Sequence, residues 1–322
     1  MHVVVCIKQV PDSREIRIDP VSNTLIREGV PAIVNIFDLH GVEEAVRIKE
    51  RIACTRVTVL TMGPKSARSA LQECISLGAD EGVLVSDRAF AGADTLATSY
   101  VLAEAIRMAA QVWGPVDLVI CGKQTLDGDT GQVGPGIAAR LDLEQLTYVE
   151  RIRSVDPDAG RITVERHLED GVEVVETSLP ALVTVVEGIN EVRRASMPGM
   201  LRAVRYEPLV WTVADFPEID RSRLGLKGSP TVVGKAWVPE PITRSGEALG
   251  GPDGDGNGND SAAQVAAAQL FDRLLATDLP ARLGWTGVGP MEGSTGSGTR
   301  DPSPHDHAVE EGNGVAADGR GR

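Results

Sequence analysis

The chain reads Val116-Asp117-Leu118-Val119-Ile120-Cys121 and then, without a break, Gly122-Lys123-Gln124-Thr125-Leu126-Asp127-Gly128-Asp129-Thr130-Gly131-Gln132-Val133-Gly134-Pro135. The apolar first part predicts a buried strand, and the polar, glycine-rich second part predicts a loop. Pro135 falls near the first turn of the helix expected next, where its missing N–H costs little. The stretch therefore predicts a strand, a loop and a helix, which is the repeating unit of a parallel α/β sheet.

The same unit recurs on both sides of this stretch. Further buried strands are expected at residues 3–7, 57–62, 82–85 and 182–186. Apolar residues at helical spacing over 67–75 predict a helix that ends at Gly78, and Asp94 predicts the N-cap of a helix running to about Gln111. Strands alternating with helices at this spacing predict right-handed crossovers. The fold class expected is therefore α/β, a doubly wound and mostly parallel sheet.

Other segments do not follow this alternation of strands and helices. Residues 8–29 are polar and predict an exposed excursion, while the alternating runs 161–167 and 172–178 predict an added antiparallel hairpin. Gly188–Arg205 has little periodicity and predicts an exposed loop. The expected organisation is an α/β domain over 1–243, a flexible linker over 244–260, an amphipathic helix or C-terminal arm over 261–280 and a disordered tail over 281–322.

Composition narrows the class of protein. The 322 residues are 42% hydrophobic but only 3% aromatic, which predicts a core of Val, Leu, Ile and Ala between helices. The net charge of -14 disfavours nucleic acid and anionic membranes as partners. With no secretory leader, no apolar run long enough to span a bilayer and no disulfide framework among its four cysteines, the chain is expected to be cytoplasmic and not an integral membrane protein.

Motifs for catalysis are missing from the sequence. It contains no HExxH, GxSxG or CxxC, and its five histidines are scattered, so neither a catalytic residue nor a metal site is expected. The neighbouring acids Glu43 and Glu44 fall on a helical pattern and are expected to face solvent. Ordinary dinucleotide and P-loop motifs are also missing.

The loop after Cys121 is the best candidate binding site. It leaves the carboxyl end of a predicted parallel strand, where α/β sheets bind ligands, and it leads into a helix N-terminus that favours phosphate. Thr130, Gln124 and Gln132 could bind phosphate or ribose oxygens, whereas Asp127 and Asp129 are expected to fix the loop through bonds to its backbone. A polar loop without any ligand is the alternative interpretation.

Several segments, taken in order, resemble electron-transfer flavoprotein β subunits. They are Val5-Cys6-Ile7-Lys8-Gln9-Val10-Pro11-Asp12, Glu28-Gly29-Val30-Pro31, Asn35-Ile36-Phe37-Asp38, Val42-Glu43-Glu44-Ala45, Gly122 to Gly134, Leu179-Pro180-Ala181, Ile189-Asn190-Glu191 and Leu226-Lys227-Gly228-Ser229-Pro230. The resemblance spans roughly residues 1 to 240. It implies a fold of the adenine-nucleotide-binding type and an electron carrier rather than an enzyme that acts alone.

The resemblance also implies a cofactor and its contacts. In this family the β subunit buries AMP, or a second FAD in the electron-bifurcating members, while the α subunit of the heterodimer holds a further FAD. Segment matching places the β-site contacts at Cys6, Asn35, Ile36, Phe37, Asp38, Met62 and each residue from Gly122 to Val133. The run from Asp127 to Pro135 resembles the two-flavin group, which favours FAD over AMP and implies oxidation of NADH within the heterodimer.

Partners follow from the same resemblance. Residues 179–201 match the segment that recognises an acyl-CoA or similar dehydrogenase, with Ile189 as an exposed apolar anchor and Asn190 and Glu191 beside it. A quinone oxidoreductase or ferredoxin is the further acceptor implied. Two departures from the family pattern, at Ile36 and Val192, leave partner choice open. A nucleotide-sensing module of the stress-protein kind is the alternative function on the same fold, and a hydrolase or ligase is a weaker one.

Overall fold

The computed structural model describes residues 1–12, 17–18, 25–26, 31–232, 234, 260–277 and 282. The chain divides into two compact units, Met1–Glu240 and Pro241–Arg322. The described residues of the second unit include the helix α6 (Asp260–Leu275), which begins one residue before the range 261–280 predicted for a C-terminal arm. The linker predicted over 244–260 and the tail predicted over 281–322 lie almost wholly outside the described residues.

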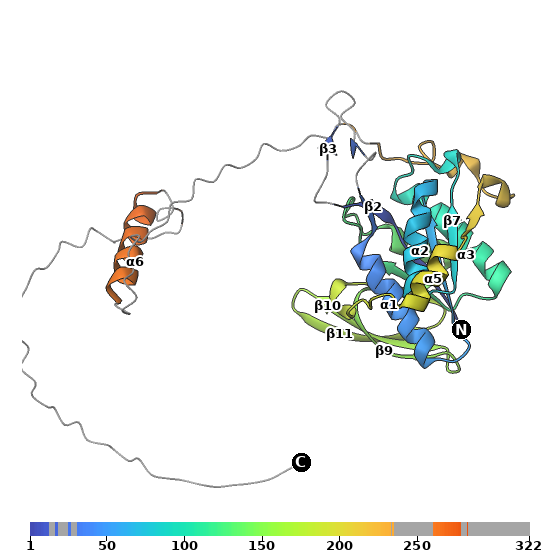
Figure 1. Cartoon of the computed structure of the whole chain (residues 1–322), viewed down its shortest axis with the longest axis horizontal. Coiled ribbons are helices and arrows are strands. Elements are labelled where there is room, and N and C mark those ends of the chain that lie inside the picture. Colours follow the sequence, from blue (N-terminus) through green and yellow to red (C-terminus); the bar gives the residue numbers. More distant parts are fainter. Residues whose placement is uncertain are drawn as a thin grey trace, which may run out of the picture. The chain divides into compact units, whose positions relative to one another are not determined.

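The first unit is built on a nine-stranded sheet (Figure 1). Its strands, in spatial order, are β11 (Gly171–Ser178), β10 (Arg161–Leu168), β9 (Glu144–Asp156), β12 (Ala181–Val185), β8 (Leu118–Gly122), β1 (His2–Cys6), β6 (Arg56–Met62), β7 (Glu81–Val85) and β13 (Leu209–Trp211). Every pairing from β9 to β13 is parallel, and β9, β10 and β11 pair antiparallel. The predicted α/β class with an added hairpin is confirmed.

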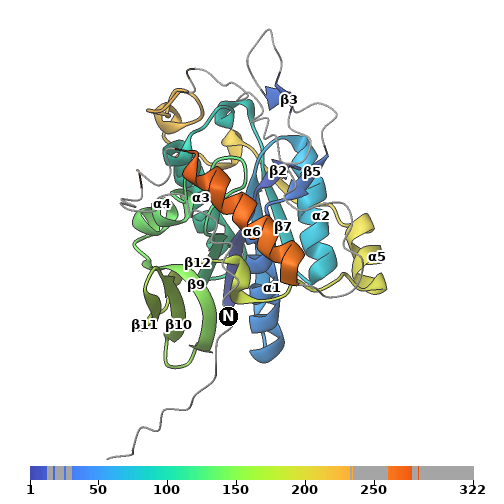
Figure 2. The same ribbon diagram turned by 90° about the vertical axis from the view of Figure 1, so that its left-hand side faces the viewer.

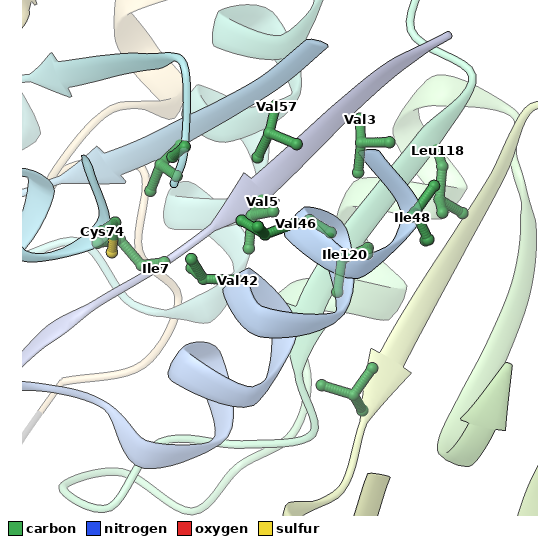
Figure 3. Close-up of a cluster of buried hydrophobic side chains, with 14 of the residues drawn as sticks. Val3, Val5, Ile7, Val42, Val46, Ile48, Val57, Cys74, Leu118 and Ile120 are labelled. Atoms are coloured by element: carbon green, nitrogen blue, oxygen red, sulfur yellow. The ribbon is translucent and has the colours of Figure 1, made fainter. Parts of the chain in front are cut away.

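Helices cover both faces of the sheet. α1 (Ile36–Arg51) and α2 (Arg68–Leu77) lie on one side, and α3 (Thr95–Trp113) and α4 (Val133–Leu141) lie on the other (Figure 2). Successive residues of β1 point to opposite faces, so Val3 and Val5 pack with α1 (Figure 3), while Val4 packs with α3 on the other face. All three are fully buried, which explains why β1 is continuously apolar.

Local signals place the helix ends where the sequence predicts them. The Asp94 carboxylate accepts a hydrogen bond of 3.0 Å from the Ala97 N–H and caps α3. Gly78 ends α2 with φ at +125°, a conformation that side chains disfavour. α3 extends two residues beyond the predicted end at Gln111, because the apolar stripe continues to Trp113.

Three parts of the first unit differ from expectation. The predicted exposed loop Gly188–Arg205 is wrong, because Met197–Arg205 forms α5. β9 and β13 were not predicted, since β9 is buried only at about every third residue and β13 has only three residues. The excursion predicted over 8–29 contains β3 (Arg17–Ile18) paired with β4 (Leu25–Ile26), and its β2 (Gln9–Pro11) pairs with β5 (Ala32–Val34) just beyond it. Single 3-10 turns lie elsewhere, at Lys65–Ala67, Arg88–Phe90, Glu187–Ile189, Val213–Asp215 and Arg221–Arg223.

Two structural features bear on membrane insertion and metal binding. None of the helices there is both long and apolar enough to cross a bilayer. The same part of the chain holds no group of three or more His, Cys, Asp or Glu residues placed to share a metal ion.

Candidate functional site

The predicted cofactor residues meet at one edge of the sheet. β8, β1 and β6 are adjacent parallel strands, and they end at Gly122, Cys6 and Met62. The N-cap residue Asn35 and the first turn of α1, which carries Ile36 to Asp38, pack against the end of β8, where Asp38 and Phe37 lie against Gly122. Segments far apart in sequence therefore assemble one edge, as expected for the carboxyl ends of parallel strands.

Asn35 holds the loop that follows β8. The residue is fully buried at the N-cap of α1, yet its side chain does not cap that helix. Its Nδ2 donates to the carbonyl oxygen of Gln124 at 2.9 Å, and its Oδ1 accepts from the Leu126 N–H at 3.1 Å. Both hydrogen-bonding groups of the amide therefore bond the loop backbone, and the side chain also bonds the Asp38 carboxylate, so Asn35 fixes the start of the loop beside the end of β8.

Asp38 links the segment after β1 to the end of β8. One carboxylate oxygen accepts from the Lys8 N–H at 2.7 Å and the other from the Gly122 N–H at 3.1 Å. Burial raises the pKa of Asp38 to about 7, although these hydrogen bonds oppose the shift. A Cβ on Gly122 would lie 2.3 Å from Oδ1 of Asp38, so only glycine lets α1 pack this closely on the end of β8.

The middle of the loop stands open. Residues 126–130 are all exposed, so the loop is not packed shut against the sheet. Asp129 and Gly131 have positive φ values of 53° and 63°, and the Gly128 and Asp129 N–H groups donate to the Thr125 carbonyl. These reversals give the loop the concave backbone course found in anion-binding turns.

Side chains fix the loop differently from expectation. Asp127 pairs with the Lys8 ammonium at 2.7 Å, and Asp129 accepts from Nε2 of Gln124 at 3.0 Å. The predicted bonds from these two acids to the loop backbone are therefore replaced, in the main, by bonds to other side chains. Burial alone would raise the pKa of Asp127, but the bonds and charge of Lys8 outweigh it and hold that pKa below its usual value.

The remaining predicted contacts surround this loop. Oε1 of Gln132 accepts from the Thr95 hydroxyl at 2.8 Å, which ties the start of α4 to the first turn of α3. The Lys123 ammonium lies 4.9 Å from the centre of the Phe37 ring. Ile36 and Met62 are half-buried, and Thr130 is exposed. The two amides predicted to bind ligand oxygens, on Gln124 and Gln132, each already bond another side chain.

Two thiols form the floor of the edge. Cys6 and Cys121 are register partners on β1 and β8, and both are buried. A hydrogen bond with the Cys6 thiol, together with burial, raises the pKa of Cys121 well above its usual range. Cys121 is therefore a packing residue rather than a nucleophile.

The predicted partner anchor is not exposed. Ile189 is half-buried and packs against the core on the α1 side of the sheet. Asn190 is held by α1, because its Oδ1 lies 2.9 Å from Nδ1 of His40 and its Nδ2 donates to Oε2 of Glu44 at 3.1 Å. Only Glu191, of the three predicted residues, presents an exposed side chain.

The acids of α1 explain this arrangement. Glu43 and Glu44 are 2% and 4% exposed, so the expectation that they face solvent is wrong. Nε of Arg193 donates to Oε2 of Glu43 at 2.7 Å, and Arg47 pairs with the other oxygen of Glu43 at 2.6 Å. These paired charges clamp the segment after Ile189 onto α1.

An apolar surface lies directly after that clamped segment. We call it the α5 face; it consists of Met197, Met200, Leu201 and Val204. Their exposed fractions are 68%, 46%, 53% and 77%, and their spacing of three, four and seven residues places them along one side of the helix. The same spacing in the sequence could have revealed this helix, but the surrounding basic residues concealed it.

Comparison with known proteins identifies the family. Residues 22–215 match the family described as the electron transfer flavoprotein domain. This chain belongs to the electron transfer flavoprotein family. It is 52% identical to protein FixA of Azotobacter vinelandii over 273 residues, which cover 84% of this chain and 95% of that protein.

Further relatives agree with this result. The chain is 47% identical to the electron transfer flavoprotein subunit beta of Thermoanaerobacterium thermosaccharolyticum over 78% of its length and 93% of that subunit. The corresponding subunit of Clostridium acetobutylicum is 46% identical over 78% of this chain and 93% of its own length. Relatives that the chain covers almost completely are thus β subunits of the family, and this chain is β-like.

The edge fits the adenine nucleotide that the family implies. The exposed loop, its positive φ values and the N-terminus of α4 offer backbone donors and a favourable dipole to a phosphate. Gly131 also suits close approach by a ligand, because its φ of 63° already disfavours a side chain and a Cβ there would lie 3.2 Å from the Lys123 carbonyl oxygen. The residues present are therefore compatible with a nucleotide held by Gly122–Val133.

Proposed function

We propose that this chain is the β subunit of a heterodimeric electron transfer flavoprotein, and that it holds FAD at the edge formed by β8, β1 and β6. One observation carries the proposal: Asn35, Asp38 and the loop after β8 are joined by hydrogen bonds into an open turn at the carboxyl ends of three parallel strands. Family membership supports electron transfer as the purpose of that turn.

Each residue of the edge has a separate task in this proposal. FAD, when bound, supplies the one- and two-electron chemistry. Asn35 keeps the loop open, and the backbone N–H groups of residues 130–132, which follow the two N–H groups bonded to Thr125, contact the phosphates. Lys8 lies beside this loop and balances the charge of Asp127, which would otherwise repel an anionic ligand. Asp38 holds the ends of β1 and β8 at fixed separation from α1.

The β site holds FAD rather than AMP in this proposal because the run from Asp127 to Pro135 resembles that of two-flavin members. The test is to co-express the chain with its large subunit, denature the purified heterodimer and count the released nucleotides by chromatography. Two flavins per heterodimer support the proposal. One flavin and one AMP show a non-bifurcating carrier with a structural nucleotide, and one flavin with no AMP contradicts a nucleotide site in this chain.

Electron bifurcation from NADH is the finer part of the proposal. The complex would oxidise NADH and pass electrons along two routes, to a quinone oxidoreductase and to ferredoxin. Rapid-mixing spectroscopy of the two-flavin complex with NADH tests this step. Reduction of both flavins with coupled reduction of ferredoxin supports it, whereas reduction by a dehydrogenase alone supports a simple carrier.

We also propose the α5 face as the docking surface for an acyl-CoA or similar dehydrogenase. Three of its four residues lie in the segment 179–201 that resembles the recognition segment of the family, and Val204 follows directly; in this proposal the face replaces Ile189 as the apolar anchor. Four adjacent exposed apolar side chains on a helix are the kind of patch that a transient partner covers. The clamp between Arg193 and Glu43 holds the preceding segment against α1 and so limits movement of this face.

A further inference from the structure

A second cavity lies away from the nucleotide edge. Its volume is about 310 Å³, and its walls come from the first turn of α3, the last turn of α4 and the segment 222–230. None of the described residues that line it belongs to the predicted nucleotide set. The two sites are nevertheless neighbours, because the bond between Thr95 and Gln132 lies at the start of α3.

Three cations line this cavity without an acidic partner. They are Arg140, Arg223 and Lys227, and none forms an ion pair within the described part of the chain. The described residues of the lining include no carboxylate. A cluster of this kind is unexpected in a chain with a net charge of -14, because acids are in excess and cations usually find one.

Arg140 is the cation of this cluster that the protein backbone holds in place. Its Nη atoms donate to the carbonyl oxygens of Gly136 and Leu96, at 3.0 and 3.1 Å, but its buried Nε has no hydrogen-bond partner among the described residues. Burial, followed by the nearby charge of Arg223, lowers the pKa of Arg140. Because this Nε is enclosed by protein atoms, an anion in the cavity would be held by the Arg223 and Lys227 side chains and by the remaining N–H groups of the Arg140 Nη atoms.

The walls of the cavity are preformed. The Asp94 carboxylate accepts from the N–H and the hydroxyl of Thr231, at 3.1 and 2.8 Å, and the Asp94 N–H donates to Oγ of Ser229 at 2.8 Å. These bonds fix the segment 225–231 on the first turn of α3. Among the described residues, Asp94 and Asp220 lie outside the lining and form no ion pair with its cations, although hydrogen bonds from Ser222 and then the charge of Arg223 lower the pKa of Asp220.

We propose that this cavity binds a small phosphate-bearing metabolite. Guanidinium and ammonium groups without a carboxylate are the donors that proteins use for phosphate. The Arg223 guanidinium already stacks 4.0 Å from the centre of the Tyr100 ring, so that ring does not receive a nucleobase. The volume lies at the lower end of the range for ligand sites, about 300–1,000 Å³, which fits a small molecule rather than a dinucleotide.

The test uses the full-length chain in complex with its large subunit, with the nucleotide sites of both subunits filled, so that pyrophosphate cannot occupy the loop after β8. Pyrophosphate is titrated by calorimetry into the wild type and into the double variant Arg223→Gln, Lys227→Gln. The matched control is Arg205→Gln, Arg221→Gln, which removes two exposed charges outside the cavity. Arg140 is left unchanged because its bonds to Leu96 and Gly136 support the fold.

The proposal predicts saturable binding to the wild type and the control, weakened roughly tenfold or more in the cavity variant. Arg223→Lys, which keeps the charge, should retain most of the binding. If the double variant does not fold, the single variant Lys227→Gln replaces it and should weaken binding by less than the double change. No saturable binding, or equal binding by all variants, overturns the proposal. A cavity variant that binds pyrophosphate like the wild type but no longer binds the large subunit also overturns the proposal, since the cavity would then hold a carboxylate of that partner.

Discussion

The side-chain amide of Asn35 lies 2.9 Å from the main-chain carbonyl oxygen of Gln124, although the two residues are 89 positions apart in the chain. The bond links the first turn of α1 to the loop after β8, and a second bond from the Leu126 N–H returns to the same amide. Because Asn35 is fully buried, the loop is positioned by the protein core rather than by solvent-exposed contacts. The open shape of the candidate site therefore depends on this residue.

Replacement of Asn35 by alanine should release the loop. The change removes the partners of two backbone groups, at about 1–3 kcal/mol for each group left buried and unpaired. We expect a lower free energy of unfolding and a marked loss of nucleotide from the purified complex, measured by denaturant unfolding and by chromatography of released nucleotides. Asn190→Ala is the matched control, because it removes a half-buried amide that bonds α1 elsewhere. Its complex should lose stability but keep its nucleotide, and equal nucleotide loss in both variants would argue against the loop clamp.

Gly122→Ala should destabilise the first unit without removing any bond. A Cβ at this position would lie 2.3 Å from Oδ1 of Asp38 and 2.7 Å from Cβ of Phe37, so α1 or β8 must move. Overpacking of this kind costs about 1–3 kcal/mol. Gly171→Ala is the control, since no described atom lies within 4 Å of the Cβ it would add. Thermal unfolding of both variants measures the difference, and a similar midpoint for the two would show that the contact at Gly122 is not tight.

Asp38 should make stability fall as the pH rises toward neutrality. Its pKa is about 7 in the folded chain and near 3.9 in an unfolded one, so between these values the folded state holds the extra proton. Stability then decreases by up to about 1.4 kcal/mol per pH unit from roughly pH 4 to pH 7, and levels off above that. Denaturant unfolding of the wild type and Asp38→Asn across this range isolates the effect. The difference between their free energies should slope with pH, and two parallel curves would contradict the raised pKa.

The α5 face should matter for partner binding but not for folding. Met200→Ser with Leu201→Ser removes two exposed apolar side chains, 46% and 53% exposed, so the free energy of unfolding should change by only about 0.5 kcal/mol. Electron transfer to or from the dehydrogenase should weaken tenfold or more, since interface anchors typically contribute 2 kcal/mol or more. The control is Val172→Ser with Val174→Ser, a pair 55% and 48% exposed on the edge strand β11. Unchanged transfer in the α5 variant, measured by dye-coupled dehydrogenase assays, would remove this face as the docking surface.

The sequence predicts best what is continuous and buried. β1, β6, β7, β8 and β12 were predictable because each contains a run of mostly apolar residues, and nearly every residue in them is buried between the two helical layers. The glycine-rich loop was equally visible, since its polar residues interrupt an apolar strand and a helix. β9 was missed because only every third or so of its residues is buried, which matches neither a buried strand nor a simple alternation.

Contacts between distant segments could not be predicted. Glu43 and Glu44 look like surface residues in their own helix, and only the fold brings Arg193 and Asn190 to them from about 150 positions away. The same clamp explains why Ile189 packs inward and leaves α5 as the exposed surface. The three cations of the second cavity likewise come from two separate segments of the chain, and their shared cavity appears only in three dimensions.

Hydrogen–deuterium exchange can show whether the loop after β8 binds the nucleotide. The experiment compares the complex stripped of nucleotide with the same complex after FAD or AMP is restored. We predict that bound nucleotide slows amide exchange in residues 122–133, and slows it less at 35–38 and around Met62. Restored nucleotide that leaves the exchange of residues 122–133 unchanged, while protecting another part of this chain or none of it, would contradict the account.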